Sequence, residues 1–140
     1  GMNGRLDAIQ AAILRVKLKH FSDEMEKRQR IAKIYDDGLK NITITPKIAP
    51  NNRSAYAQYT ILVPNRDEFI AKMNDKGIPT AIHYPIPLYK QEVYKYMNIN
   101  SSSYPVCEEI SSKVISLPFS PFITQEQQEF VIDAIKGILA

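Results

Sequence analysis

His83 and Tyr84 are the residues of this chain whose types and position best suit ligand chemistry. They stand in the stretch PTAIHYPIP, residues 79–87, where a β-forming run gives way to closely spaced prolines. Histidine titrates nearest to neutral pH and can donate or accept a hydrogen bond. Pro85 and Pro87 force an extended exit from the strand, because each fixes its own φ angle and disfavours the α region for the preceding residue. Two interpretations stay open here: a ligand site bordered by a stiff loop, or a packed histidine beside one.

Other catalytic patterns give no competing site. The five glycines form neither GxGxxG nor GxxxxGK[ST], and no GxSxG is present. The two histidines lie far apart with no cysteine or carboxylate at zinc spacing, so we expect no metal site. The acid pairs Asp36–Asp37 and Glu108–Glu109 occupy neighbouring helical positions that point in different directions, and we interpret them as solvated surface.

The composition is typical of one ordinary globular domain. Of 140 residues, 44% are hydrophobic and 24% charged, so neither disorder nor a coiled coil is indicated. The net charge of +3 is mild, and acidic residues are interleaved with the basic clusters, so we expect no nucleic-acid binding. No apolar run would span a membrane and no charged leader opens the chain, so we expect a cytoplasmic protein. The single Cys107 fits a reducing compartment and is interpreted as a small buried hydrophobe.

The hydrophobic pattern predicts a helical start. Residues 5–20 carry apolar groups with the three-and-four spacing of one helix face, and a second helical stretch follows over about 23–39. These segments could form one long bent helix or two helices at an angle. The first face consists of Leu6, Ile9, Ala12, Ile13 and Val16.

The rest of the chain alternates between strand and helix patterns. Strands are predicted over 56–64, 78–84 and 114–118, and helices over 65–76, 91–97, 106–113 and from 124 onward. Asn65 with Glu68, and Thr124 with Gln127, have the spacing of capping boxes. The last helix is expected to direct these residues to the core: Phe130, Val131, Ile135 and Ile138. The order predicts a single α+β domain over 1–140, with a small, mostly antiparallel sheet covered by helices and preceded by a long N-terminal helical arm.

The segment GMNGRLDAIQAAILRVKL resembles the pattern G-x-N-x-R-L/M-D-x-x-Q-A-A-x-L of the DegT/DnrJ/StrS family of pyridoxal-phosphate-dependent sugar aminotransferases. The resemblance continues, in order and at suitable distances, through KRQRIAKIYDDGL, QYTILVPNRDEF, KGIPTAIHYPIPLYKQ and VISLPFSPFITQEQ. It therefore covers essentially the whole chain.

The resemblance implies that the chain is the C-terminal small domain of a fold-type I aminotransferase. Family members carry the lysine that forms a Schiff base with pyridoxal 5'-phosphate in a large N-terminal domain, to which nothing here corresponds. Their reaction moves an amino group, usually from glutamate, to a keto group on a nucleotide-linked sugar, with the cofactor as electron sink. This chain alone is therefore expected to be inactive and not to hold the cofactor by itself. The alternative is a non-catalytic interaction or oligomerisation module that kept the fold.

The resemblance also assigns roles to particular residues. Asn3 matches an asparagine that reaches the cofactor phosphate of the partner subunit, with a helix N-cap as the alternative. Arg5 could contact an anionic ligand or brace the interface of a homodimer formed through the helical arm. His83 and Tyr84 match the H-Y-P step that borders the sugar-nucleotide site. Tyr89 stands where many relatives have a second histidine, so it can donate a hydrogen bond or stack but is not cationic near neutral pH.

Overall fold

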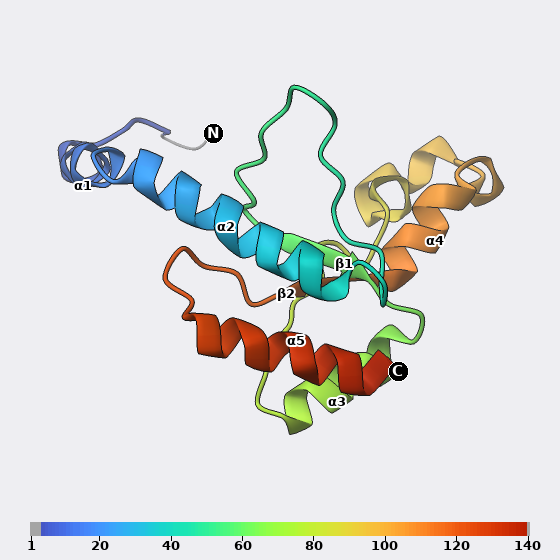
Figure 1. Cartoon of the computed structure of the whole chain (residues 1–140). Coiled ribbons are helices and arrows are strands. Elements are labelled where there is room, and N and C mark those ends of the chain that lie inside the picture. The colour runs from blue at the N-terminus through green and yellow to red at the C-terminus, as the bar shows by residue number, and fades with distance from the viewer. Residues whose placement is uncertain (1–3, 140) are drawn as a thin grey trace.

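The computed structural model describes residues 4–139 and shows helices packed on a small antiparallel sheet (Figure 1). The helices and strands are α1 (Ala8–Leu18), α2 (Phe21–Leu39), β1 (Tyr59–Leu62), α3 (Arg66–Asp75), α4 (Pro105–Lys113), β2 (Val114–Leu117) and α5 (Gln125–Leu139). Short 3₁₀ turns occupy Leu88–Lys90, Glu92–Met97 and Ser101–Ser103. The predicted α+β class is confirmed.

The sheet is smaller than the sequence suggests. Strands β1 and β2 pair antiparallel from Tyr59 opposite Leu117 to Leu62 opposite Val114. The strand predicted over 78–84 is wrong in extent, because only Ala81 in that segment forms a bridge, to Ser116. Prolines explain the loss, since Pro79 has no N–H to donate and Pro85 ends the segment. The chain therefore leaves the sheet directly after its one bridge, and His83 follows two positions later.

The core lies between one face of the sheet and the helices. Burial alternates along β1, where Tyr59 and Ile61 are fully buried and Thr60 and Leu62 only partly. This period of two is that of a strand with one covered face. The helices cover that face with a single cluster of buried residues that includes Ile31, Ala32, Tyr35, Leu39, Phe69, Met73, Val131, Ile132 and Ile135.

Helices α2 and α5 approach each other closely within this core. A Cβ placed on Gly38 would lie 2.9 Å from Cδ1 of Ile132, so the absence of a side chain permits the contact. Gln128 is 1% exposed and donates from Nε2 to the carbonyl oxygen of Ile31 at 2.6 Å. The Tyr35 hydroxyl donates to the carbonyl oxygen of Pro118 at 2.8 Å. A buried polar group pays a desolvation penalty unless it is hydrogen-bonded. Because a shift of α2 along its axis would break both bonds, they also fix the position of α2 against α5 and the end of β2.

The N-terminal arm is formed by two helices at an angle (Figure 1). A turn at residues 19–20 separates α1 from α2, which settles the alternative that the sequence left open. The C-terminal half of α2 lies on the core, but α1 buries none of its residues. Its large apolar side chains are all more than half exposed: Ile9, Ile13, Leu14, Val16 and Leu18. Ile9, Ile13 and Val16 belong to the face predicted from periodicity, and no residue among 4–139 covers it.

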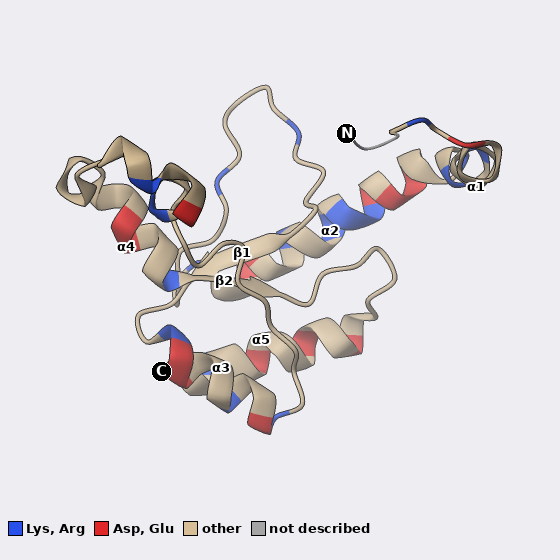
Figure 2. Ribbon diagram, turned by 180° about the vertical axis from the view of Figure 1, so that it is seen from behind, with Lys and Arg blue, Asp and Glu red and all other residues tan. Residues whose placement is uncertain are grey.

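Charged residues are mixed over the helices (Figure 2). Many pair with an opposite charge one turn away, as in Lys27–Asp23 and Lys33–Asp37. Such pairs belong to solvated helix faces. Within residues 4–139, no helix combines the length and apolar character needed to cross a membrane.

Some of the predicted caps and buried residues are present in the structure and others are not. The capping box at α5 is confirmed, because Thr124 Oγ1 accepts from the Gln127 N–H at 3.2 Å and Gln127 Oε1 accepts from the Thr124 N–H at 3.0 Å. Asn65 makes no such side-chain bond to α3. Phe130 was expected in the core but is 56% exposed. Cys107 is exposed, as no residue of α4 is buried. The interpretation of Cys107 as a buried hydrophobe is therefore wrong.

Candidate functional site

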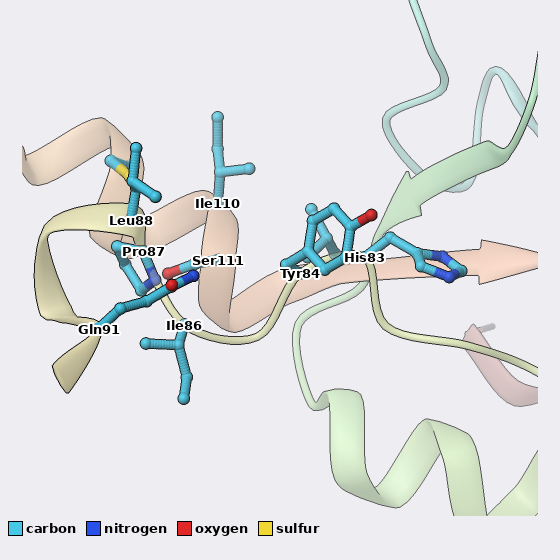
Figure 3. Close-up of a pocket in the computed structure, with 10 residues that line it drawn as sticks. His83, Tyr84, Ile86, Pro87, Leu88, Gln91, Ile110 and Ser111 are labelled. Atoms are coloured by element: carbon cyan, nitrogen blue, oxygen red, sulfur yellow. The ribbon is translucent and has the colours of Figure 1, made fainter. Parts of the chain in front are cut away.

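The segment after Ala81 forms one wall of a surface pocket of about 420 Å³. The other wall comes from α4 and the start of β2. Figure 3 shows the side chains that line it, among them Ile86, Pro87, Leu88 and Gln91 from the first wall and Ile110 and Ser111 from the second. Most of this lining is apolar, with a few polar groups from His83, Tyr84, Gln91 and Ser111. Mostly apolar concave surfaces with a few placed polar groups are typical of small-molecule sites.

His83 is held by a hydroxyl chain on the sheet face away from the core. Its Nδ1 lies 3.1 Å from Oγ of Ser116, which is only 4% exposed. Thr60 Oγ1 lies 2.8 Å from the same Ser116 oxygen. If Ser116 donates to Nδ1, the neutral imidazole carries its proton on Nε2 and can donate to a ligand. Figure 3 shows the ring lying along β2 and pointing away from Pro87 and Leu88.

Tyr84 follows His83, and Figure 3 shows its ring between His83 and the other labelled residues of the pocket. Its side chain is 71% exposed, and its ring meets the His83 imidazole edge-on with centroids 5.6 Å apart. The peptide bond between these two residues is cis. An exposed aromatic ring beside an apolar pocket offers a surface on which a planar group can stack. The structure thus brings two of the predicted substrate residues together at one pocket.

Tyr89, the third predicted substrate residue, does not line this pocket. Its hydroxyl donates to Oε1 of Glu108, and its ring packs tilted against Tyr104 with centroids 5.1 Å apart. Desolvation, with the hydrogen bond to Glu108, raises the pKa of Tyr89 to about 12. The ammonium of Lys90 reaches the other carboxylate oxygen of Glu108 at 2.5 Å. The hydrogen bonds from Lys90 and Tyr89 lower the pKa of Glu108.

Glu108 and Ser116 were missed at the sequence level. Glu108 was interpreted with Glu109 as solvated surface, and this holds for Glu109, which pairs with Lys113 one turn along α4. Glu108 instead bonds residues 18 and 19 positions away, which no local spacing indicates. Ser116 sits inside a predicted strand, and only the observed sheet places it beside His83.

Of the two residues predicted to contact a cofactor, only Arg5 is described by the structure, and it does not line this pocket. Asn3 is outside the described residues. Arg5 is exposed on the coil that leads into α1. Figure 1 shows α1 on the opposite side of the molecule from α4. No described residue forms an ion pair with it. Within residues 4–139 no group of three or more His, Cys, Asp or Glu side chains is arranged to hold a metal ion. The side chains that line the pocket offer a ligand hydrogen bonds and apolar contact.

Comparisons with known proteins match nearly the whole chain. The family model described as DegT/DnrJ/EryC1/StrS aminotransferase family matches residues 1–136. The UDP-2-acetamido-2-deoxy-3-oxo-D-glucuronate aminotransferase of Pseudomonas aeruginosa is 41% identical over 136 residues, covering 96% of this chain and 37% of that protein. The dTDP-3-amino-3,6-dideoxy-alpha-D-galactopyranose transaminase of Aneurinibacillus thermoaerophilus is 37% identical over 136 residues with the same coverage.

Solved structures give the same result for the fold. The crystal structure of a DegT DnrJ EryC1 StrS aminotransferase from Brucella abortus superposes with a TM-score of 0.93 at 41% identity. The superposition covers 100% of this chain and 38% of the Brucella chain. The chain thus spans about 37% of the length of the curated relatives described above.

Proposed function

Because the chain belongs to the DegT/DnrJ/EryC1/StrS aminotransferase family, we propose that the whole protein transfers an amino group to a keto group of a nucleotide-linked sugar. The expected amino donor is glutamate and the expected compartment is the cytoplasm. Residues 1–140 would form the C-terminal small domain of that enzyme. The observation that carries the proposal is the match over residues 1–136, together with relatives named for transamination of UDP- and dTDP-linked sugars.

In this proposal His83 and Tyr84 contact the nucleotide-linked sugar. Ser116 holds His83 through Nδ1, so Nε2 is free to meet a sugar hydroxyl or a diphosphate oxygen. The exposed ring of Tyr84 offers apolar surface for stacking beside it. Two prolines stiffen the segment that follows, so less conformational entropy is lost when a ligand binds. In this proposal the residues of this chain bind and orient the nucleotide-linked sugar, and the groups that transfer protons during transamination belong to the rest of the enzyme.

The proposed cofactor is pyridoxal 5'-phosphate, which when bound supplies an electron sink at the reacting carbon. The chemistry of Arg5 fits a phosphate, because a guanidinium presents several N–H donors in a fork and stays charged. Arg5 is exposed and has no carboxylate partner among the described residues, so it is available to an anion. We assign Asn3 and Arg5 to the phosphate of the partner subunit's cofactor. The lysine that binds the cofactor would come from the part of the protein outside this chain.

The proposed homodimer forms through the arm. Its support is the exposed apolar face of α1, since neighbouring exposed apolar side chains on one helix face are typical of an interaction site. A groove of about 490 Å³ lies on another side of α1 from Ile9, Ile13 and Val16, and it is lined by Leu6, Leu14, Leu18 and Phe21 with Arg15 and Lys17. A partner that covers it would also bring the Arg5 segment of one subunit towards the other.

The test is an assay of the full-length protein. Glutamate is supplied with UDP- and dTDP-linked 3-keto sugars, and release of 2-oxoglutarate is followed together with the mass of the aminated sugar nucleotide. We expect turnover with at least one of these sugars, and a rise of KM of about tenfold or more in His83→Ala, as for loss of one hydrogen bond to a charged group. The proposal would be overturned if the protein bound neither the UDP-linked nor the dTDP-linked sugar and released no 2-oxoglutarate.

The chain of 140 residues is the matched control. We expect it to be inactive in the same assay and to show no borohydride-fixed pyridoxal adduct. Turnover by this chain alone would contradict its assignment as a non-catalytic part of the enzyme. The intact mass of the natural gene product from its source cells would decide whether this domain lives alone as a module.

A further inference from the structure

The pocket wall formed by residues 84–98 is held together mainly from within. Its backbone hydrogen bonds are local, such as Lys90 N–H to the Pro87 carbonyl at 2.9 Å and Tyr94 N–H to the Gln91 carbonyl at 2.9 Å. Pro85 and Pro87 remove two backbone donors that could have joined the sheet. We call this segment the pocket loop. Something other than backbone pairing must fix it against the rest of the molecule.

Glu108 supplies that fixation. Among residues 4–139, the hydrogen bonds that join the pocket loop to another segment both end on its carboxylate, one from the Tyr89 hydroxyl and one from the Lys90 ammonium. Tyr104 adds a packed ring against Tyr89. An ionised carboxylate that accepts from two donors forms charge-assisted bonds, which are stronger than neutral ones. The lowered pKa of Glu108 and the raised pKa of Tyr89 widen the pH range around neutrality over which the carboxylate is ionised and the hydroxyl keeps its proton.

We propose that Glu108 is a positioning residue, which sets the affinity of the pocket for the nucleotide-linked substrate by clamping the pocket loop onto α4. The proposal rests on the function proposed above. Glu108 lies between Cys107 and Ile110, which line the α4 wall, while its two partners are continuous with Pro87 and Leu88 of the opposite wall. The carboxylate therefore fixes the separation of the two walls without lining the pocket itself. Tyr89 acts through Glu108 rather than on the substrate.

The experiment uses the full-length protein and compares Glu108→Ala with Glu109→Gln. Glu109 is the matched control, because it is the next residue of α4 and pairs only with Lys113 on the same helix. Binding of UDP and dTDP is measured by calorimetry, and KM and kcat are measured with the nucleotide sugar. For Glu108→Ala we expect Kd and KM to rise about tenfold, or about 1.4 kcal/mol, with kcat within about twofold of wild type. Glu109→Gln should leave all of these values unchanged.

Two further variants separate positioning from general loss of structure. Glu108→Gln keeps an acceptor for Tyr89 and should recover part of the affinity. The double variant Tyr89→Phe/Glu108→Ala should have the same Kd and KM as Glu108→Ala alone, because both substitutions remove the same hydrogen bond. Additive losses would mean that Tyr89 touches the substrate itself, and would overturn the proposal.

The outcomes distinguish this inference from the function on which it rests. If wild type turns over a nucleotide sugar and Glu108→Ala has the same KM as wild type, the positioning role of Glu108 (the clamp) is overturned and the proposed function stands. If wild type binds UDP or dTDP without transaminating any sugar, and Glu108→Ala weakens that binding, the clamp stands and the function is overturned. If wild type neither binds a nucleotide nor transaminates, both are overturned.

Discussion

Ser116 connects Thr60 to His83, and its removal tests how the histidine is held. Ser116→Ala would leave two polar groups short of a partner on a partly buried sheet face, so we expect a loss of about 1–2 kcal/mol in the free energy of unfolding. Urea denaturation measures this value. The control is Ser112→Ala on α4, where the exposed hydroxyl bonds only the Glu109 carbonyl. Equal losses in the two variants would argue against a structural role for the Ser116 chain.

Glu108 should also make stability depend on pH. Its pKa is lowered from the ordinary value of 4.5, so the unfolded chain takes up its proton more readily than the folded one. The stabilisation is therefore present above about pH 4.5 and is lost as the pH falls through the lower, folded value. We expect the difference in unfolding free energy between wild type and Glu108→Gln to be largest near neutral pH and to shrink towards pH 3. A difference that grows on acidification would contradict this sign.

The same residues show what the sequence could and could not predict about the site. His83 and Tyr84 stand out because a titratable and an aromatic residue precede a run of prolines, and this signal is local. Glu108 and Ser116 become visible only when distant segments are brought together, since each partner lies at least 18 positions away. The location of the pocket was predictable, and the residues that hold it were not.

At the scale of elements, the crossing of α2 and α5 depends on a residue without a side chain. Gly38→Val would place a branched side chain where Ile132 already lies within 3.0 Å, so we expect a destabilisation of about 1–3 kcal/mol from overpacking. Gly137→Val in α5 is the control, because no atom lies within 4 Å of a Cβ at that position. Thermal unfolding followed by circular dichroism compares the two. A Gly38→Val protein as stable as its control would show that the crossing can adjust freely.

Element predictions succeeded where the pattern was long and failed where it was short. All the long helices are present, because their periodic apolar faces extend over several turns. The segment over 78–84 has β-forming residues, but prolines leave it a single bridge. Two capping boxes have the same spacing, yet only the one at Thr124 forms. Side-chain spacing allows a cap, and the direction in which the chain enters the helix decides whether it is made.

At the scale of the whole molecule, the uncovered arm predicts self-association. Ile13 is 55% exposed on α1, and a charge there cannot be buried against a partner without a large desolvation cost. We expect Ile13→Glu to weaken association of this chain at least tenfold, as measured by sedimentation velocity over a range of concentrations. Val106→Glu on α4, at a site 66% exposed, should not weaken it. A chain that is monomeric before any substitution would contradict the proposed role of α1.

The contact between Gln128 and Ile31, 97 positions apart, has a consequence for how the protein is made. Synthesis proceeds from the N-terminus, so the apolar surface of α2 leaves the ribosome long before the helix that covers it. Strand β1 likewise cannot pair until β2 has been made, because residues 63–113 separate the two strands and bringing them together costs conformational entropy. The core can therefore close only when the last 15-residue helix has emerged. A ribosome that stalls or terminates shortly before α5 would release a chain with the core face of α2 open to aggregation and proteolysis.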